Sequence, residues 1–195
     1  MNRTIVDRLV SSIGAVMGVA LLVASGLLFF AHGYVHGQVT DQLREQQISF
    51  PAAGTKAITS LPSADQTAIN QYAGQQLVNG AQAKAFADHY IKVHLSEVAG
   101  GQTYSQVSSK ALANPQDQQL AGQVQTLFRG ETLRGLLLNA YAFDTMANVA
   151  FIAAWVSLLG GIVLLVLSAL GLVHSRRPAS DLAATTAEAQ PIPVG

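Results

Sequence analysis

Two stretches of this sequence decide its fold: IGAVMGVALLVASGLLFFA at Ile13–Ala31 and VAFIAAWVSLLGGIVLLVLSALGLV at Val149–Val173. Neither contains a charged residue, and each is long enough to cross the hydrocarbon core of a bilayer, which takes roughly 20 apolar residues. Both also lack histidine, whereas ion paths and proton relays place ionisable side chains inside such stretches. The sequence therefore predicts two membrane anchors and argues against a channel or a transporter.

The two anchors divide the chain into five predicted segments. These are a cytoplasmic tail (1–10), the first transmembrane helix (11–32), an extracytoplasmic α-helical domain (33–147), the second transmembrane helix (148–173) and a disordered cytoplasmic tail (174–195). The last segment is rich in Ala, Thr and Pro, a composition that favours disorder over a packed core.

Arginines at the outer ends of both anchors predict the orientation. Arg3 and Arg8 precede the first anchor, and Arg176 and Arg177 follow the second. Because cytoplasmic flanks carry an excess of positive charge, we expect a plasma-membrane protein with both termini in the cytoplasm. A cleaved signal peptide is the alternative, but the first apolar run is longer than the roughly 7–15 residues of a signal peptide, and no clear cleavage site follows.

Small residues recur at helical spacing in both anchors. Gly14 and Gly18 form a GxxxG pair in the first, and Ser157 and Gly161 form its counterpart in the second. Such pairs let helix backbones approach closely, so they predict either a hairpin within one chain or a homo-oligomer. They also have a simpler explanation, because glycine is common in membrane helices.

Composition excludes several classes of protein. The 195 residues include 11 basic and 11 acidic side chains, for a net charge of zero, and no cysteine. Without a basic run, nucleic-acid binding is not expected. Without cysteine, the outer domain has no disulfides, no cysteine-based zinc site and no thiol chemistry.

Helical signals fill most of the segment between the anchors, and no alternating β-branched run is present, so we predict an all-α bundle. The first helix should continue through Leu43 and end near Phe50-Pro51, before a loop over 51–62. Ser63 and Gln66 resemble a capping box. The residues Ile69, Tyr72, Ala73 and Leu77 then predict one amphipathic face.

A longer apolar stripe follows and should end at Gly100-Gly101, since glycine commonly terminates helices. Thr103 and Gln106 predict a second capping box, opening a helix through Ala113. Asn114-Pro115 predicts a further helix start. The predicted apolar positions of the stripe are Ala83, Phe86, Ala87, Tyr90, Ile91, His94 and Val98, and those of the helix after Pro115 are Leu120, Val124, Leu127 and Phe128.

The stretch 131–143, ETLRGLLLNAYAF, leads directly into the second anchor and is more apolar than the helices before it. One interpretation is a segment that docks a partner or lies on the lipid. The other is the membrane-proximal core of the bundle, with Tyr141 in the aromatic belt at the interface. Both remain open from the sequence.

No residue pattern rises to a catalytic signature. The chain lacks the HExxH, GxSxG, Walker-A and dinucleotide-binding motifs. His32 and His36 would share a helix face, but two ligands make a weak metal site, and His89 and His94 would point apart. Glu131 and Arg134 have the spacing of a helical ion pair. We therefore predict no catalytic, cofactor or metal site.

Several short strings resemble an uncharacterised family of actinobacterial membrane proteins. They are VTDQL at Val39–Leu43, ISFP at Ile48–Pro51, YAGQ at Tyr72–Gln75, Asn79-Gly80, GQTYS at Gly101–Ser105 and FRGETLRGLLLNAY at Phe128–Tyr141. The resemblance implies two anchors and a helical outer domain without an established activity. Some members carry an automatic label of aromatic ring-opening dioxygenase, but that chemistry needs a His/carboxylate metal set, and the sequence shows none.

The leading hypothesis is therefore a non-enzymatic membrane protein that presents a helical domain to an envelope partner. A sensor or ligand-binding module that acts through a separate output partner is the alternative. A metal-dependent enzyme that uses His32, His36 or His89 is the third hypothesis.

Overall fold

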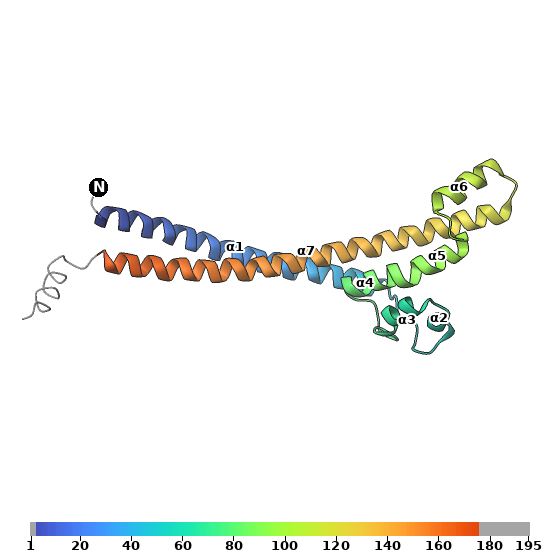
Figure 1. Ribbon diagram of the computed structural model, residues 1–195, viewed down its shortest axis with the longest axis horizontal. Coiled ribbons are helices and arrows are strands. Elements are labelled where there is room, and N and C mark those ends of the chain that lie inside the picture. The colour runs from blue at the N-terminus through green and yellow to red at the C-terminus, as the bar shows by residue number, and fades with distance from the viewer. Residues whose placement is uncertain (1–2, 176–195) are drawn as a thin grey trace, which may run out of the picture. The chain divides into compact units, whose positions relative to one another are not determined.

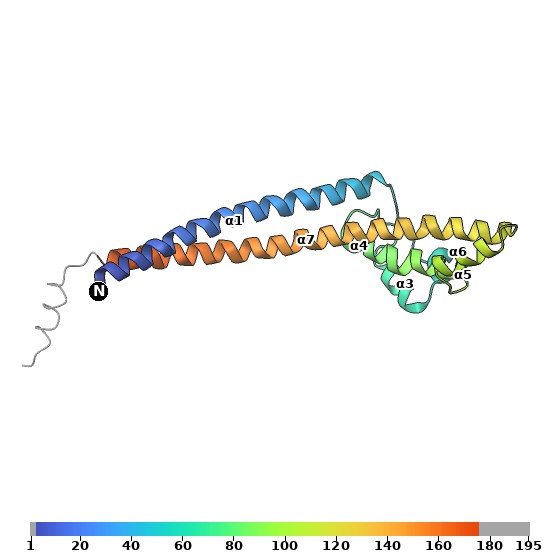
Figure 2. The same ribbon diagram turned by 90° about the horizontal axis from the view of Figure 1, so that it is seen from above.

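The computed structural model describes residues 3–175 and confirms an all-α chain (Figures 1 and 2). Within that range no β-strand is present, and β-pairing is limited to one antiparallel bridge between Ser49 and Gln76. The helices are α1 (Arg3–Glu45), α2 (Lys56–Thr59), α3 (Ser63–Asn70), α4 (Gly80–Phe86), the π-helix η1 (Ala87–Ile91), α5 (Lys92–Ala99), α6 (Tyr104–Ala113) and α7 (Gln118–His174).

The chain forms two compact units, and α1 and α7 contribute residues to both. Met1–Phe30 and Phe151–Gly195 make up the first, which we call the paired-helix unit. Ala31–Ala150 make up the second, which we call the central unit. The predicted tail over 174–195 lies almost wholly outside the described residues.

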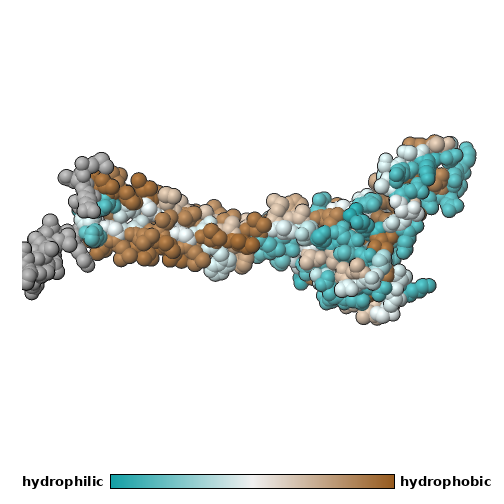
Figure 3. Space-filling model, viewed as in Figure 1, coloured by the Kyte–Doolittle hydropathy of each residue, from teal (hydrophilic) through white to brown (hydrophobic). Residues whose placement is uncertain are grey.

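Helices α1 and α7 are long and apolar enough to cross a membrane. In the most apolar window of each, only 11% is buried, and large aliphatic side chains such as Val16 and Val156 are 71% and 67% exposed. On the face drawn in Figure 3, hydrophobic residues cover this unit, whereas much of the central unit is hydrophilic. The two helices are therefore not the buried core of a soluble domain, which would cover such side chains with protein.

In the paired-helix unit α1 and α7 lie side by side and antiparallel, and small residues make their contact. A Cβ on Gly18 would lie 3.1 Å from the carbonyl oxygen of Gly161, and a Cβ on Gly161 would lie 2.9 Å from that of Gly18. A Cβ on Gly14 would lie 2.6 Å from Oγ of Ser168. Helices α1 and α7 therefore form a hairpin within the chain, and Gly14, Gly18 and Gly161 lie at their contact. A homo-oligomer through these positions stays a prediction, and it would have to displace these contacts.

A hydroxyl group and aromatic rings extend the pairing along the same two helices. The buried hydroxyl of Ser25 donates to the carbonyl oxygen of Ala154 at 2.9 Å. The ring of Phe29 meets Phe151 and Trp155 edge to face, with centroids 5.9 and 5.4 Å apart. In lipid, helices gain little from burying apolar surface against each other. The interhelical hydrogen bond and the edge-to-face rings favour their close packing in that setting.

The central unit has its own core, which packs α4, η1 and α5 antiparallel along α7 (Figures 1 and 2). The amide of Gly80 reaches Asp144, and the side chain of Leu95 lies against Gly130. Fully buried Ile58, Ile69, Leu77, Val107 and Leu127 belong to the same cluster, which extends to Val39 and Leu43 of α1.

The π-helix shifts the predicted apolar stripe. Its i→i+5 hydrogen bonding places more residues in the turn than an α-helix does, so the buried positions that follow it move on by one residue. Ala83, Phe86, Ala87 and Ile91 are buried as predicted. After the π-helix, Leu95 and Ala99 are buried in place of the predicted His94 and Val98, and Val98 is 37% exposed. The predicted end of the stripe is confirmed, because Gly100 closes α5 in the left-handed region with φ 58°.

The predicted helix start at Thr103 is confirmed, and the one at Asn114 is wrong. At Ser63 a helix begins as predicted, but the capping box does not form. Thr103 and Gln106 form the expected capping box of α6. Ser63 is instead the first residue of α3 after Pro62, and the side-chain amide of Gln66 donates to the carbonyl oxygens of Thr59 and Leu61. No side-chain hydrogen bond caps that helix.

Asn114 ends α6 rather than starting α7. Its side-chain amide donates to the carbonyl oxygen of Lys110. Asp117 caps α7, because its carboxylate accepts from the amides of Gln119 and Leu120. An ionised acceptor at this position also interacts favourably with the helix dipole, so the carboxylate three residues later replaces the predicted start.

Three further expectations need correction. The helix α1 ends at Glu45, earlier than predicted, because the chain turns at Gln47 and the next residues pair with the segment around Gln76. The predicted loop over 51–62 contains α2. Phe128, predicted to be buried, is 57% exposed.

The predicted amphipathic helix across Ile69 to Leu77 is shorter than expected. It ends at Asn70, and turns follow, so Leu77 reaches the core from outside a helix. The amide of Leu77 donates to the carbonyl oxygen of Ile48 at 2.8 Å. Tertiary pairing with this segment therefore replaces the predicted helix.

A substitution at Gly161 tests the close approach of α1 and α7. In Gly161→Leu the new side chain meets the Gly18 carbonyl oxygen, so the hairpin must open, and we expect the free energy of unfolding to fall by about 1–3 kcal/mol. The measurement is thermal unfolding in detergent micelles. Gly26→Leu is the matched control, because nothing lies within 4 Å of a Cβ there. Equal loss in both variants would contradict the pairing.

Candidate functional site

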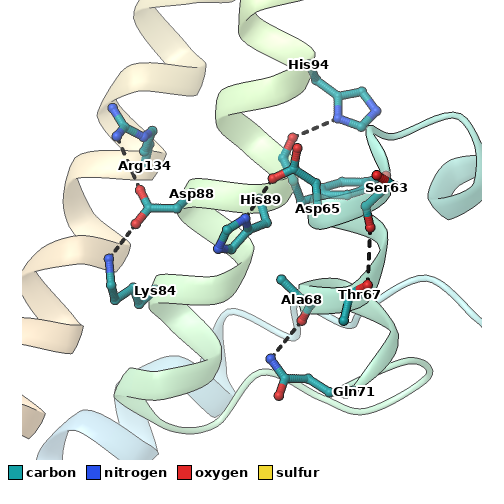
Figure 4. A network of polar contacts seen from close by, with 11 residues as sticks. Ser63, Asp65, Thr67, Ala68, Gln71, Lys84, Asp88, His89, His94 and Arg134 are labelled. Carbon is teal, nitrogen blue, oxygen red and sulfur yellow. Dashed lines mark hydrogen bonds and ion pairs between the residues drawn. The ribbon is translucent and has the colours of Figure 1, made fainter.

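Polar side chains of the central unit gather around η1 (Figure 4). π-helices are rare and occur frequently at functional sites, and this one carries Asp88 and His89. Among the described residues, no group of three or more His, Cys, Asp or Glu side chains is placed to hold a metal ion. The polar cluster around η1 is the candidate site, and it combines carboxylates and an imidazole with the cations of Lys84 and Arg134.

His89 is oriented by a carboxylate from another helix. Its Nδ1 atom lies 2.7 Å from Oδ1 of Asp65, which α3 contributes. With the proton on Nδ1, the imidazole donates to the carboxylate and leaves Nε2 as an acceptor. Their side chains are 40% and 20% exposed. A catalytic triad orients its base in the same way but adds a hydroxyl nucleophile, and within residues 3–175 no hydroxyl group is hydrogen-bonded to His89.

Asp88, on the same π-helix as His89, accepts hydrogen bonds from two cationic side chains. Nζ of Lys84 lies 2.6 Å from Oδ2, and a guanidinium nitrogen of Arg134 lies 3.3 Å from Oδ1. Burial alone would raise the pKa of Asp88, but the hydrogen bonds and charges of Lys84 and Arg134 outweigh it and hold the pKa below its ordinary value. The hydrogen bond to Asp88 raises the pKa of Lys84 in turn. The network links α4, η1 and α7.

A polar cavity of about 380 Å³ lies between α3 and the η1–α5 segment. Asp65, Asp88 and Glu97 contribute carboxylates to its lining, and Lys92 contributes a cation. Spacing along the chain does not bring Asp88 and Glu97 together, but the fold places both at this cavity. The carboxylate of Asp88 is already paired with Lys84 and Arg134, so Asp65, Glu97 and Lys92 are the other charged residues of the lining.

His94 and Glu131 each contact a residue three or four positions away along the chain. Nδ1 of His94 lies 2.8 Å from the carbonyl oxygen of Tyr90, one helical turn earlier, as expected for a histidine whose hydrogen bonding is satisfied locally. Arg134 pairs with Glu131 at 3.3 Å as predicted, and its bond to Asp88 adds a partner that spacing alone could not reveal.

A second polar cluster joins α1, α4 and α7 within the central unit. The buried carboxylate of Asp144 lies 2.7 Å from Nδ1 of His36 and accepts from the amide of Gly80 at 3.2 Å. Nδ1 of His32 lies 2.9 Å from the carbonyl oxygen of Ala147, and the two imidazoles stack with centroids 5.7 Å apart. The predicted shared face of His32 and His36 is confirmed.

Sequence reasoning missed Asp144, Asp65 and Lys84, which all belong to these clusters. Asp144 carried a readable signal, because it is the single charge in a long apolar run toward the second anchor, and a buried charge needs a partner. Asp65 carried none, since its partner His89 lies 24 residues away on another helix.

Comparison of the chain with protein-family models, with curated proteins and with solved structures gives no match.

Acid titration tests the Asp88 network. A carboxylate whose pKa is lowered by folding stabilises the protein above its ordinary pKa of 3.8 and loses that contribution as the pH falls through the lower folded value. Asp88→Asn therefore lowers the free energy of unfolding at pH 7, by about 1–3 kcal/mol. The difference from the unmodified chain should shrink below about pH 5. Urea unfolding across this range measures it.

Asp41→Asn is the control, because Asp41 is exposed on α1. A difference between Asp88→Asn and the unmodified chain that does not change with pH would contradict the assignment.

Proposed function

We propose that this chain is a non-enzymatic membrane protein that holds an α-helical interaction module on the outer face of the plasma membrane, with both termini in the cytoplasm. The observation that carries the proposal is the contrast between the two units. One exposes aliphatic side chains along most of two paired helices, and the other encloses its own core while leaving selected large apolar side chains uncovered.

The bilayer is the solvent that fits the paired-helix unit. Exposing apolar side chains such as Val16 and Val156 to water is unfavourable, whereas contact with lipid is not. A cleaved signal peptide would remove most of α1 and leave Gly161, Ser168 and the carbonyl oxygen of Ala154 without their α1 contacts. Retention of both helices therefore agrees better with their contacts.

The α6–α7 hairpin carries the proposed partner surface. Leu112 is 81% exposed, Phe128 is 57% exposed and Tyr104 is 38% exposed. The rings of Tyr104 and Phe128 lie 6.1 Å apart, so they expose aromatic surface together. Exposed aromatic pairs of this kind are enriched where proteins bind partners, and we propose an envelope protein as the partner.

The absence of cysteine allows a direct test of orientation. Ser109→Cys places a thiol at an exposed position of α6, and Ser180→Cys places one beyond the second anchor. A membrane-impermeant maleimide added to intact cells should label Ser109→Cys and not Ser180→Cys, because only the former faces outward in the proposed topology.

Permeabilised cells should label both variants, which controls for thiol reactivity. The reverse pattern in intact cells would overturn the topology. A shortened protein that has lost the first anchor would show that α1 is a signal peptide.

Replacement of Phe128 tests the partner surface. A buried aromatic anchor at an interface contributes about 2 kcal/mol or more, so Phe128→Ser should lower the amount of a stoichiometric co-purifying protein by about tenfold or more. The measurement is quantitative mass spectrometry after purification of tagged protein in mild detergent.

Gln125→Ser, one turn earlier at an exposed polar position, is the matched control and should retain the partner. An unchanged thermal midpoint in Phe128→Ser excludes misfolding as the cause. Equal recovery of the partner with both variants would contradict the proposed surface.

A further inference from the structure

An apolar groove of about 390 Å³ runs between the end of α1 and the middle of α7, inside the central unit. Its volume lies within the range of roughly 300–1,000 Å³ that small-molecule sites occupy. Three buried aliphatic residues belong to its lining, Val39 and Leu43 from α1 and Leu137 from α7. The more exposed Leu136 and Phe143 line it from α7.

The groove contains no charged side chain among the described residues that line it. Its polar lining residues are Gln42, Gln46 and Asn139, which are neutral amides at exposed positions. A ligand that carries its charge into the groove would lose hydration there without an opposite charge to replace it. The lining therefore selects an uncharged hydrocarbon ligand, and amides at its edge can donate to a neutral polar group such as an ester carbonyl.

The place of the groove on α7 indicates the source of that ligand. Leu133, Leu136, Ala140 and Phe143 recur along one helix, and Phe143 lies only six residues before the charge-free stretch that begins at Val149. Six residues of α-helix correspond to about 9 Å. A hydrocarbon chain held in a bilayer can bridge a distance of that order, so membrane lipid is the apolar ligand nearest to the groove.

We infer that this groove binds one acyl chain of a membrane lipid. The inference rests on the membrane location proposed above and adds a ligand site to the central unit. Recognition through hydrocarbon and neutral amides makes the site indifferent to the charge of the headgroup. Bound lipid would cover side chains of Leu136 and Phe143 that are otherwise 61% and 55% exposed.

Photo-crosslinking tests the inference with the full chain. The protein is reconstituted in phosphatidylcholine vesicles that contain a phosphatidylcholine with a diazirine in the middle of one acyl chain. After irradiation, mass spectrometry should find lipid adducts on residues 39–48 and 133–143 as well as on the two anchors. Adducts confined to the anchors would overturn the acyl-chain site and leave the membrane location supported. Adducts on neither region would overturn both.

A pair of matched tryptophan variants distinguishes a bound chain from chance contact. Ala140 lines the groove, whereas Ala142 is exposed and does not. Ala140→Trp fills the groove and should reduce groove adducts by about tenfold relative to anchor adducts. Ala142→Trp should leave them unchanged. Equal adduct levels in both variants would overturn the inference.

Two further measurements keep the result interpretable. If Ala140→Trp lowers the thermal midpoint, Leu136→Trp offers the same obstruction from an exposed position in the groove. Leu136→Cys tests a second copy as the occupant. Efficient disulfide dimers in vesicles, together with an absence of groove adducts in the unmodified chain, would assign the groove to a protein interface and overturn the lipid site.

Discussion

The pairing of α1 with α7 is the contact on which the rest of the structure depends. In hydrocarbon, a leucine gains little by touching another leucine instead of a lipid tail, so the association must come from close backbone approach and hydrogen bonds. Gly18 against Gly161 and the Ser25 hydroxyl on the Ala154 carbonyl supply both. Because small residues make this contact, the large side chains of both helices remain free to face lipid.

Within the central unit the same two helices are joined by different chemistry. Asp144 is buried, and a buried carboxylate is costly unless donors surround it. His36 from α1 and the amide of Gly80 at the start of α4 provide them. One carboxylate therefore ties three helices together. Removal of a donor would leave the charge partly unpaired, so this contact constrains their register more strongly than an apolar contact of similar size.

The sequence predicted several features that depend on neighbouring residues, although the equally local Ser63–Gln66 capping box did not form. Thr103 with Gln106, and the glycine stop at Gly100, are local signals, and both are confirmed. The helix start predicted at Asn114-Pro115 is wrong because the carboxylate of Asp117, three residues later, accepts from the first amides of α7 instead. The π-helix, and the pairing of Asp65 with His89 across 24 residues, depend on tertiary packing, which sequence spacing does not encode.

Distance along α7 separates the apolar groove from the exposed apolar side chains of the α6–α7 hairpin. Phe143 lies six residues before Val149 and Phe128 lies 21 residues before it, which correspond to about 9 and 30 Å of helix. A lipid tail still held in the bilayer can cover the first distance, whereas the second equals the whole thickness of the hydrocarbon core. The distances therefore agree with the two proposals, lipid as the ligand of the groove and a protein as the partner of the α6–α7 hairpin. A single helix can present both because it runs without interruption from Gln118 to His174.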